Sequence, residues 1–242
     1  MHARLLVDQY WHRYQLLPVP PRSESFACSA EPIVHARLAQ PTLCVLSRSL
    51  DWRHGRLEQH PDRVCKLLKV MGRASLRSLK LAGNALCKQA TIALTHWIMH
   101  PECLLQDLDL SRNPLGDGGG HQILKGLRSN GSLTALHLDE CMLTNAITRK
   151  LIKLARANKS IRKLTLSWNG IEAQGVLDLL EVVVSEADVT WTSLDVSSNS
   201  FGLYVDGASP EQAALLMEWK HSARTRKNLC VQLGHIYGLD TV

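Results

Sequence analysis

Long apolar runs are missing from this 242-residue sequence, and aromatic residues are scarce. No stretch approaches the roughly 18 consecutive apolar residues that a membrane-spanning helix requires. The amino-terminal residues also lack the apolar core of a secretory signal. Aromatic side chains make up 5% of the chain, and six of them are Trp. We therefore expect a globular protein that has no membrane partner.

The cysteines lack any recognisable pairing pattern. They number seven, which is odd, and no two of them form a Cys-x-x-Cys motif. Such a set favours buried, reduced thiols in the cytoplasm over a disulfide framework. The spacing of His96, His100 and Cys103 would suit zinc on one helix face, but Pro101 would interrupt that helix. We therefore expect neither a metal nor a cofactor.

Motifs of catalysis are not evident either. The segment 116–120, GDGGG, lacks the Gly-Lys-Ser/Thr that completes a phosphate-binding loop. We interpret it as the turn before a helix, with Asp117 as the N-cap residue. No Ser-His-Asp or Cys-His arrangement stands out. The sequence therefore predicts a protein that is not an enzyme.

The positive charge is spread too thinly to indicate a nucleic-acid-binding domain. The formal net charge is +6, and residues 1–75 hold 11 Lys and Arg against 6 Asp and Glu, whereas residues 76–202 hold 13 against 12. Nucleic-acid-binding domains usually concentrate far more charge. We therefore expect other proteins as partners. An RNA- or ribosome-associated subunit that uses the basic amino-terminal arm is an alternative.

Five copies of one pattern, LxxLxLxxNxL, occupy the middle of the chain. The copies begin at Leu76, Leu105, Leu133, Ile161 and Trp191, in steps of 29, 28, 28 and 30 residues. Alternating leucines place one face of a short strand in the core. The turn position holds Asn in four copies and Cys141 in the third, where a side chain can hydrogen-bond backbone groups of the curved strand. Apolar residues at spacings of four follow most copies and indicate a helix.

These repeats, together with the phrases NPLGDGG and NKSIRKLTLSWNGI, resemble the ribonuclease-inhibitor-like class of leucine-rich repeats. The resemblance covers about residues 74–202. It implies an α/β solenoid, a curved arc with parallel strands on the concave face and helices on the convex face. The stretch NKSI…LSWN is similar to leucine-rich-repeat subunits of ciliary and centrosomal assemblies. The resemblance implies a binding scaffold in which Cys141 is a structural residue.

The repeats divide the chain into four parts. Residues 1–40 are an irregular arm with an amphipathic helix, which we expect to contact a neighbouring chain or the flank of the solenoid. Residues 41–75 are a cap, with a helix over 62–71 and a degenerate strand over 43–50, and residues 76–202 hold the five repeats. Residues 203–242 form a second cap, in which the sequence from Ser209 to Gln212 predicts a helix start. Alternation over 229–233 predicts a closing strand.

Seven residues of the predicted concave face form the candidate binding site. They combine carboxylates, two cationic or titratable side chains and one aromatic: Asp107, Asp109, Arg112, His137, Asp139, Glu140 and Trp168. Trp and Arg are frequent interface anchors, and the carboxylates favour a partner with basic and apolar groups. The stripe of Arg149, Lys153 and Arg156 on the third helix is interpreted as a solvated outer face, with contact to an acidic partner as the alternative.

Together these observations predict a non-enzymatic protein-interaction scaffold. We expect a structural subunit of a larger complex, ciliary or cytoskeletal in type, in the cytoplasm. The alternative is an inhibitor or sensor of the ribonuclease-inhibitor type. Five repeats make a shallow arc, which argues against wrapping around a whole enzyme.

Overall fold

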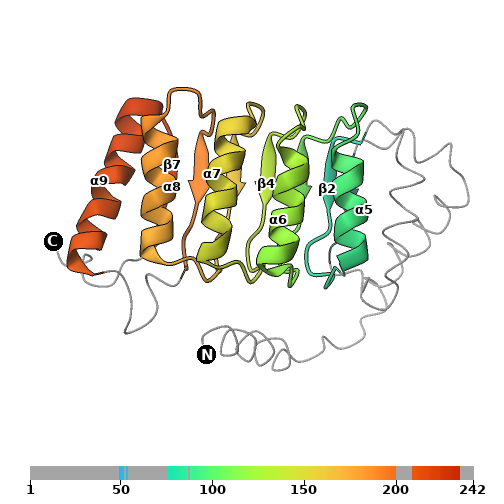
Figure 1. The fold of residues 1–242 in the computed structure, drawn as a ribbon, viewed down its shortest axis with the longest axis horizontal. Coiled ribbons are helices and arrows are strands. Elements are labelled where there is room, and N and C mark those ends of the chain that lie inside the picture. Colours follow the sequence, from blue (N-terminus) through green and yellow to red (C-terminus); the bar gives the residue numbers. More distant parts are fainter. Residues whose placement is uncertain (1–48, 52, 54–75, 87, 200–208, 235–242) are drawn as a thin grey trace, which may run out of the picture.

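The fold is a single parallel sheet covered on one side by a row of helices (Figure 1). The computed structural model describes residues 49–51, 53, 76–86, 88–199 and 209–234. The seven strands follow one another in sequence order. Their bounds are β1 Ser49–Asp51, β2 Ser78–Lys80, β3 Asp107–Asp109, β4 Ala135–His137, β5 Lys163–Thr165, β6 Ser193–Asp195 and β7 Cys230–Gln232. The helices are α5 Lys88–Ile98, α6 Gly116–Leu127, α7 Thr148–Ala157 after the 3-10 turn η2 Asn145–Ile147, α8 Ala173–Ser185 and α9 Pro210–Lys227.

The core lies between the sheet and the helices. The central leucines of β2 to β6 pair in direct register, and each is completely buried: Leu79, Leu108, Leu136, Leu164 and Leu194. The two flanking residues of each strand point to the opposite face. The α/β solenoid that the repeats predict is therefore confirmed, with strands on one face and helices on the other.

A ladder of buried asparagines joins successive repeats at the turns after β2, β3, β5 and β6, and Cys141 takes the place of asparagine after β4. In Asn113, Oδ1 accepts the backbone N–H groups of Asn84 and Leu86 at 3.1 Å, while Nδ2 donates to the carbonyls of Leu81 and Leu110 at 2.9 and 2.8 Å. Asn113 thus satisfies backbone groups of its own repeat and of the preceding one, and Asn169 and Asn199 do the same. The predicted role of this position is confirmed.

A second asparagine ladder, which the sequence analysis missed, lies at the ends of the helices. Asn130 donates from Nδ2 to the carbonyl of Ile98, the last residue of α5, at 2.9 Å. Asn158 donates in the same way to Leu127, the last residue of α6, at 2.7 Å. These side chains satisfy carbonyls that a helix end leaves open. The available signal was the phrase Asn-x-Ser, which recurs 28 residues later at 158–160.

The predicted role of Asp117 as an N-cap is wrong. Leu115 occupies the N-cap position of α6, and no side chain caps the helix there. Asp117 lies in the first turn, and its carboxylate accepts the backbone N–H of Thr144 at 2.9 Å and the hydroxyl of Thr144 at 2.6 Å. The solenoid brings the turn before α7 next to the start of α6, and two donors from one residue outcompete the local cap.

The carboxy-terminal cap matches its prediction. Ser209 and Gln212 form a reciprocal capping box at the start of α9, with Pro210 in the first helical position. The predicted closing strand is β7, where Val231 is buried and pairs with Leu194 of β6. At the other end, β1 coincides with the end of the predicted strand over 43–50 and pairs with β2. The predicted arm over 1–40 and the helix over 62–71 lie outside the described residues.

Candidate protein-binding surface

The seven candidate residues lie on the strand face of the solenoid, on three neighbouring repeats. Asp107 and Asp109 flank the central leucine of β3, and His137 ends β4. The other four follow the strands: Arg112, Asp139, Glu140 and Trp168. Backbone hydrogen bonds continue between these turns, for example from Arg112 N–H to the carbonyl of Asp139 at 2.8 Å. The fold therefore places the seven on adjacent strands and on the turns that follow them, and that they bind a partner stays a prediction.

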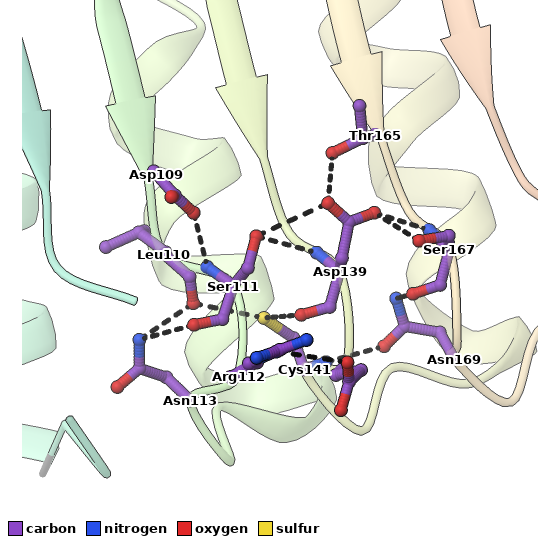
Figure 2. A network of polar contacts seen from close by, with 11 residues as sticks. Asp109, Leu110, Ser111, Arg112, Asn113, Asp139, Cys141, Thr165, Ser167 and Asn169 are labelled. Atoms are coloured by element: carbon purple, nitrogen blue, oxygen red, sulfur yellow. Dashed lines mark hydrogen bonds and ion pairs between the residues drawn. The ribbon is translucent and has the colours of Figure 1, made fainter. Parts of the chain in front are cut away.

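Asp139 is a brace between repeats (Figure 2). Its Oδ1 accepts the backbone N–H and the hydroxyl of Ser167 at 2.7 and 2.8 Å. Its Oδ2 accepts the hydroxyl of Thr165 at 2.6 Å and that of Ser111 at 3.3 Å. Four donors from the repeats on either side occupy this carboxylate, so Asp139 stabilises the contacts between neighbouring repeats. Nothing in the sequence next to Asp139 points to Ser111, Thr165 and Ser167 as donors, because they lie 26 to 28 residues away.

Asp109 is engaged locally. Its Oδ1 accepts the backbone N–H of Ser111 at 3.0 Å, and Asp195 makes the same contact with Ser197 at 2.9 Å. This Asx turn, two residues long, orders the chain as it leaves the strand. The motif Asp-x-Ser, which begins at the last residue of both strands, was the sequence signal for this turn. One oxygen of Asp109 thus supports the turn.

Asp107 and His137 belong to a chain of polar contacts across three strands. Asp107 Oδ2 accepts the hydroxyl of Ser78 at 3.1 Å, while Oδ1 is buried without a hydrogen bond, 3.5 Å from His137 Nε2. His137 Nδ1 lies 3.1 Å from Thr165 Oγ1. Because the Thr165 hydroxyl is donated to Asp139, its oxygen accepts from His137 Nδ1–H. In a neutral ring with the proton on Nδ1, the lone pair of Nε2 faces Asp107 Oδ1. In a protonated ring, Nδ1–H donates to Thr165 and Nε2–H donates to Asp107.

A row of residues with left-handed backbone runs along the rim of this face. We call it the left-handed row: Gly83, Arg112, Glu140, Trp168 and Ser198, with φ of 68°, 58°, 53°, 56° and 56°. They occupy the same position in successive repeats, directly before the ladder residue. Glycine is the residue that adopts this conformation without steric cost. Four of the five positions nevertheless carry side chains.

The left-handed row displays an ion pair beside an aromatic ring. Arg112 Nε lies 3.2 Å from Glu140 Oε1, with the Arg112 side chain more than half exposed. Trp168, in the next repeat, is 43% exposed and is among the few large apolar side chains of the described residues that reach solvent to this extent. A left-handed bulky residue is rare in proteins. Trp168 is therefore both strained and exposed.

Cys141 faces away from this surface into the core. Its thiol is completely buried and donates to the carbonyl of Leu110 at 3.3 Å. Burial raises the pKa of the Cys141 thiol far above its usual range, and the backbone N–H of Asn113 opposes this only in part. A thiol with a raised pKa is a poor nucleophile. The predicted structural role, a buried thiol at the turn of the third repeat, is confirmed.

Two further features of the described residues bear on the sequence analysis. No group of three or more His, Cys, Asp or Glu side chains there is arranged to hold a metal ion, and this includes the zinc candidates near Cys103. In the same part of the chain, no helix is long and apolar enough to cross a membrane.

The repeats match known proteins. A family model described as Leucine Rich repeat matches residues 103–123 and 157–180. The chain is 28% identical to ribonuclease inhibitor of Mus musculus over 168 residues, or 54% of this chain and 36% of that protein. It is 30% identical to ribonuclease inhibitor of Sus scrofa over 146 residues, or 48% of this chain and 32% of that protein.

A third relative is much longer. NACHT, LRR and PYD domains-containing protein 5 of Homo sapiens is 26% identical over 211 residues, or 84% of this chain and 17% of that protein. The chain thus spans about a third of the length of the ribonuclease inhibitors it matches, and a smaller share of this longer protein.

Proposed function

Because the chain belongs to the leucine-rich-repeat family, in its ribonuclease-inhibitor-like class, we propose that it is a non-catalytic scaffold that binds another protein on the rim of its strand face. The contact centres on Arg112, Glu140 and Trp168 of the left-handed row. Proteins of this family present the strand face to partners, and the binding site lies in side chains that the fold itself does not need.

The observation that carries the proposal is the large, exposed indole of Trp168 at a left-handed position. A non-glycine residue in the left-handed region costs roughly 1–2 kcal/mol, and the exposed ring contributes little to the core. Gly83 shows that the same position accepts glycine. A tryptophan kept there at this cost is best explained by a contact with another molecule, because Trp and Arg dominate the binding energy of interfaces.

The surroundings of Trp168 define the partner. Four donors already occupy the carboxylate of Asp139, so it has little capacity left to bind a partner. The negative charge available on this face is therefore smaller than the four carboxylates of the candidate site suggest. Asp109 retains a carboxylate oxygen without a hydrogen bond from the described residues, whereas the free oxygen of Asp107 is buried beside His137. We therefore assign to the partner an apolar side chain that packs on the indole, with a basic group nearby that faces β3.

The test compares two glycine substitutions of the left-handed row. Trp168→Gly relieves left-handed strain and adds chain entropy to the unfolded state; each effect is about 1 kcal/mol, and they oppose each other. Ser198→Gly makes the same backbone change one repeat later and is the matched control. Tagged protein is captured from cell extract, partners are identified by mass spectrometry, and the affinity of each purified partner is then measured.

We expect Trp168→Gly to weaken binding by more than about 1 kcal/mol, the threshold for an interface anchor. Ser198→Gly and Lys88→Ala, which lies on the outer side of α5, should change it little. A partner that binds the Trp168→Gly protein as tightly as the unchanged protein would show that the rim is not the binding surface.

We also propose a setting: a structural subunit of a larger complex in the cytoplasm, ciliary or cytoskeletal in type. The support is the similarity of the stretch 158–171 to subunits of such assemblies and the buried thiols of Cys103 and Cys141. Imaging of the tagged full chain beside ciliary and centrosomal markers tests this. A diffuse signal and a monomeric elution profile from extract would contradict it.

The similarity to ribonuclease inhibitors favours a second candidate, an inhibitor of a ribonuclease. A direct assay of ribonuclease activity with added protein decides between the two. If the protein inhibits the ribonuclease and Trp168→Gly abolishes the inhibition, the rim is still the binding surface and the ribonuclease is its partner. If there is no inhibition, the scaffold function stands.

A further inference from the structure

A second charged surface lies on the helix side of the solenoid. α6 and α7 lie next to each other in the outer row (Figure 1). These helices carry exposed His121 and Lys125 on α6 and exposed Lys153 on α7, with Lys150 of α7 half-buried beside them. The cations are close enough to act on the histidine: burial and the charges of Lys150, Lys125 and Lys153 lower the pKa of His121.

No acidic group neutralises this surface. Within the part of the chain that the structure describes, no carboxylate lies at ion-pair distance from His121 or from the three lysines. The acidic residue of α6, Asp117, is held by Thr144. Arg156 of α7 is paired elsewhere, since its Nη2 binds Glu186 of the neighbouring repeat at 2.7 Å. The repulsion among the three lysines is therefore uncompensated, and it acts on His121 when that ring is protonated.

We infer that this surface, here called the basic ridge (His121, Lys125, Lys150 and Lys153), binds an acidic polypeptide segment, separately from the partner on the strand face. On α6 the ridge extends from His121 to Lys125, about 6 Å along the helix axis, and the axis of the neighbouring α7 lies about 8–10 Å away. An extended segment of about three residues spans the distance between the two helices. Alternate carboxylates of such a segment would face the lysines and remove the repulsion among them.

The surroundings of the basic ridge favour a polypeptide over nucleic acid or a lipid surface. A protein that binds a nucleic-acid backbone can neutralise about six to ten phosphates, whereas the three lysines of the ridge and the adjacent Arg149 of α7 amount to four permanent cations. The next helix, α8, carries Asp178 and Glu181 and no Lys or Arg, so it would repel a phosphate backbone that continued across it. A lipid-binding helix inserts apolar side chains, and α6 and α7 contribute none of the large apolar residues exposed in the described part of the chain.

The experiment measures binding of a fluorescein-labelled peptide of about ten residues in which Glu and Gly alternate. Fluorescence anisotropy follows its binding to the full chain. The variant Lys125→Gln/Lys153→Gln removes two charges of the basic ridge. The matched control, Lys80→Gln/Lys220→Gln, removes two lysines from β2 and α9 and therefore has the same net charge. Circular dichroism confirms that both proteins fold.

We expect the ridge variant to lose roughly two- to fivefold in affinity for each lysine removed, the range of exposed ion pairs, and the control to change little. Trp168→Gly should bind the peptide normally, which separates this surface from the rim. Equal weakening in both double variants would mean nonspecific charge attraction and overturn the inference. So would tighter binding of a single-stranded oligonucleotide of equal charge that depends on the same two lysines.

The imidazole of His121 supplies an independent readout. Its ring signals are followed by NMR through a pH titration, with and without the peptide. The other charged side chains on its own and adjacent helices are Lys88 and His96 on α5, Asp117 on α6, and Arg149 and Arg156 on α7. Bound carboxylates should raise the lowered pKa of His121 towards its ordinary value. An unchanged pKa with the peptide bound would place the peptide elsewhere and overturn the inference.

Discussion

Cys141 interrupts the asparagine ladder, and replacing it with Asn should stabilise the fold. In the preceding repeat, two backbone N–H groups depend on the residue at position 141. Where the ladder is intact, Asn169 Oδ1 accepts both equivalent groups, from Cys141 and Leu143, at 3.0 Å. At the interruption, Leu115 N–H turns to the carbonyl of Asn113 instead, at 2.7 Å. A thiol cannot accept two such bonds strongly.

The magnitude follows from the bonds that Asn would add. Its Oδ1 would accept from Asn113 and Leu115, and its Nδ2 would replace the thiol contact with Leu110 O, now 3.3 Å long. Each net hydrogen bond contributes about 0.5–1.5 kcal/mol, from which the burial of a larger polar group subtracts. We expect a gain of about 1–2 kcal/mol in the free energy of unfolding. For a chain of this size that corresponds to about 2–8 °C in Tm.

Thermal and urea unfolding of Cys141→Asn, followed by circular dichroism, measure this gain. Cys141→Ala is the control, because it removes the thiol contact and adds no acceptor, so it should fall below the unchanged protein. If Cys141→Asn were no more stable than Cys141→Ala, the turn would not depend on side-chain acceptors, and the reasoning from the ladder would fail.

Two other predictions concern polar contacts between repeats. Asp139→Ala strips four donors of their acceptor and should cost about 1–3 kcal/mol in urea unfolding, whereas Asp109→Ala, which removes one backbone contact, should cost less; equal costs would contradict the bracing role. The hydrogen bond from Arg156 lowers the pKa of Glu186 below its ordinary 4.5, so the pair stabilises the fold above that pH and is lost as the pH falls through the lowered value. Glu186→Gln should flatten this part of the stability–pH curve measured by thermal unfolding, and an unchanged curve would show that the pair contributes nothing.

The architecture was predictable because the residues that determine the structure of each repeat lie within that repeat. The positions of Leu79 and its equivalents depend on a pattern a few residues long, repeated five times, and so does the turn role of Cys141. The capping box at Ser209 is local in the same sense. Such features need no knowledge of distant contacts.

The positions of the candidate site residues in the fold were predictable, but the charge that they leave available to a partner was not. Asp139 reads as an open carboxylate, because its donors come from residues 26 to 28 positions away in the sequence. Asp117 was misassigned for the same reason, since Thr144 reaches it from the next repeat. The left-handed conformation of Trp168 has no local signal either, as glycine marks that position only at Gly83.

The spacing of the left-handed row also restricts which secondary structure a partner segment lying across it can have. Neighbouring strands are about 4.8 Å apart, so the row offers one side chain at each such step. An α-helix advances about 5.4 Å per turn, whereas alternate residues of an extended chain lie about 6.6 Å apart. A helix laid at right angles to the strands would keep one turn opposite each of Arg112, Glu140 and Trp168, while an extended chain would drift out of step within three repeats.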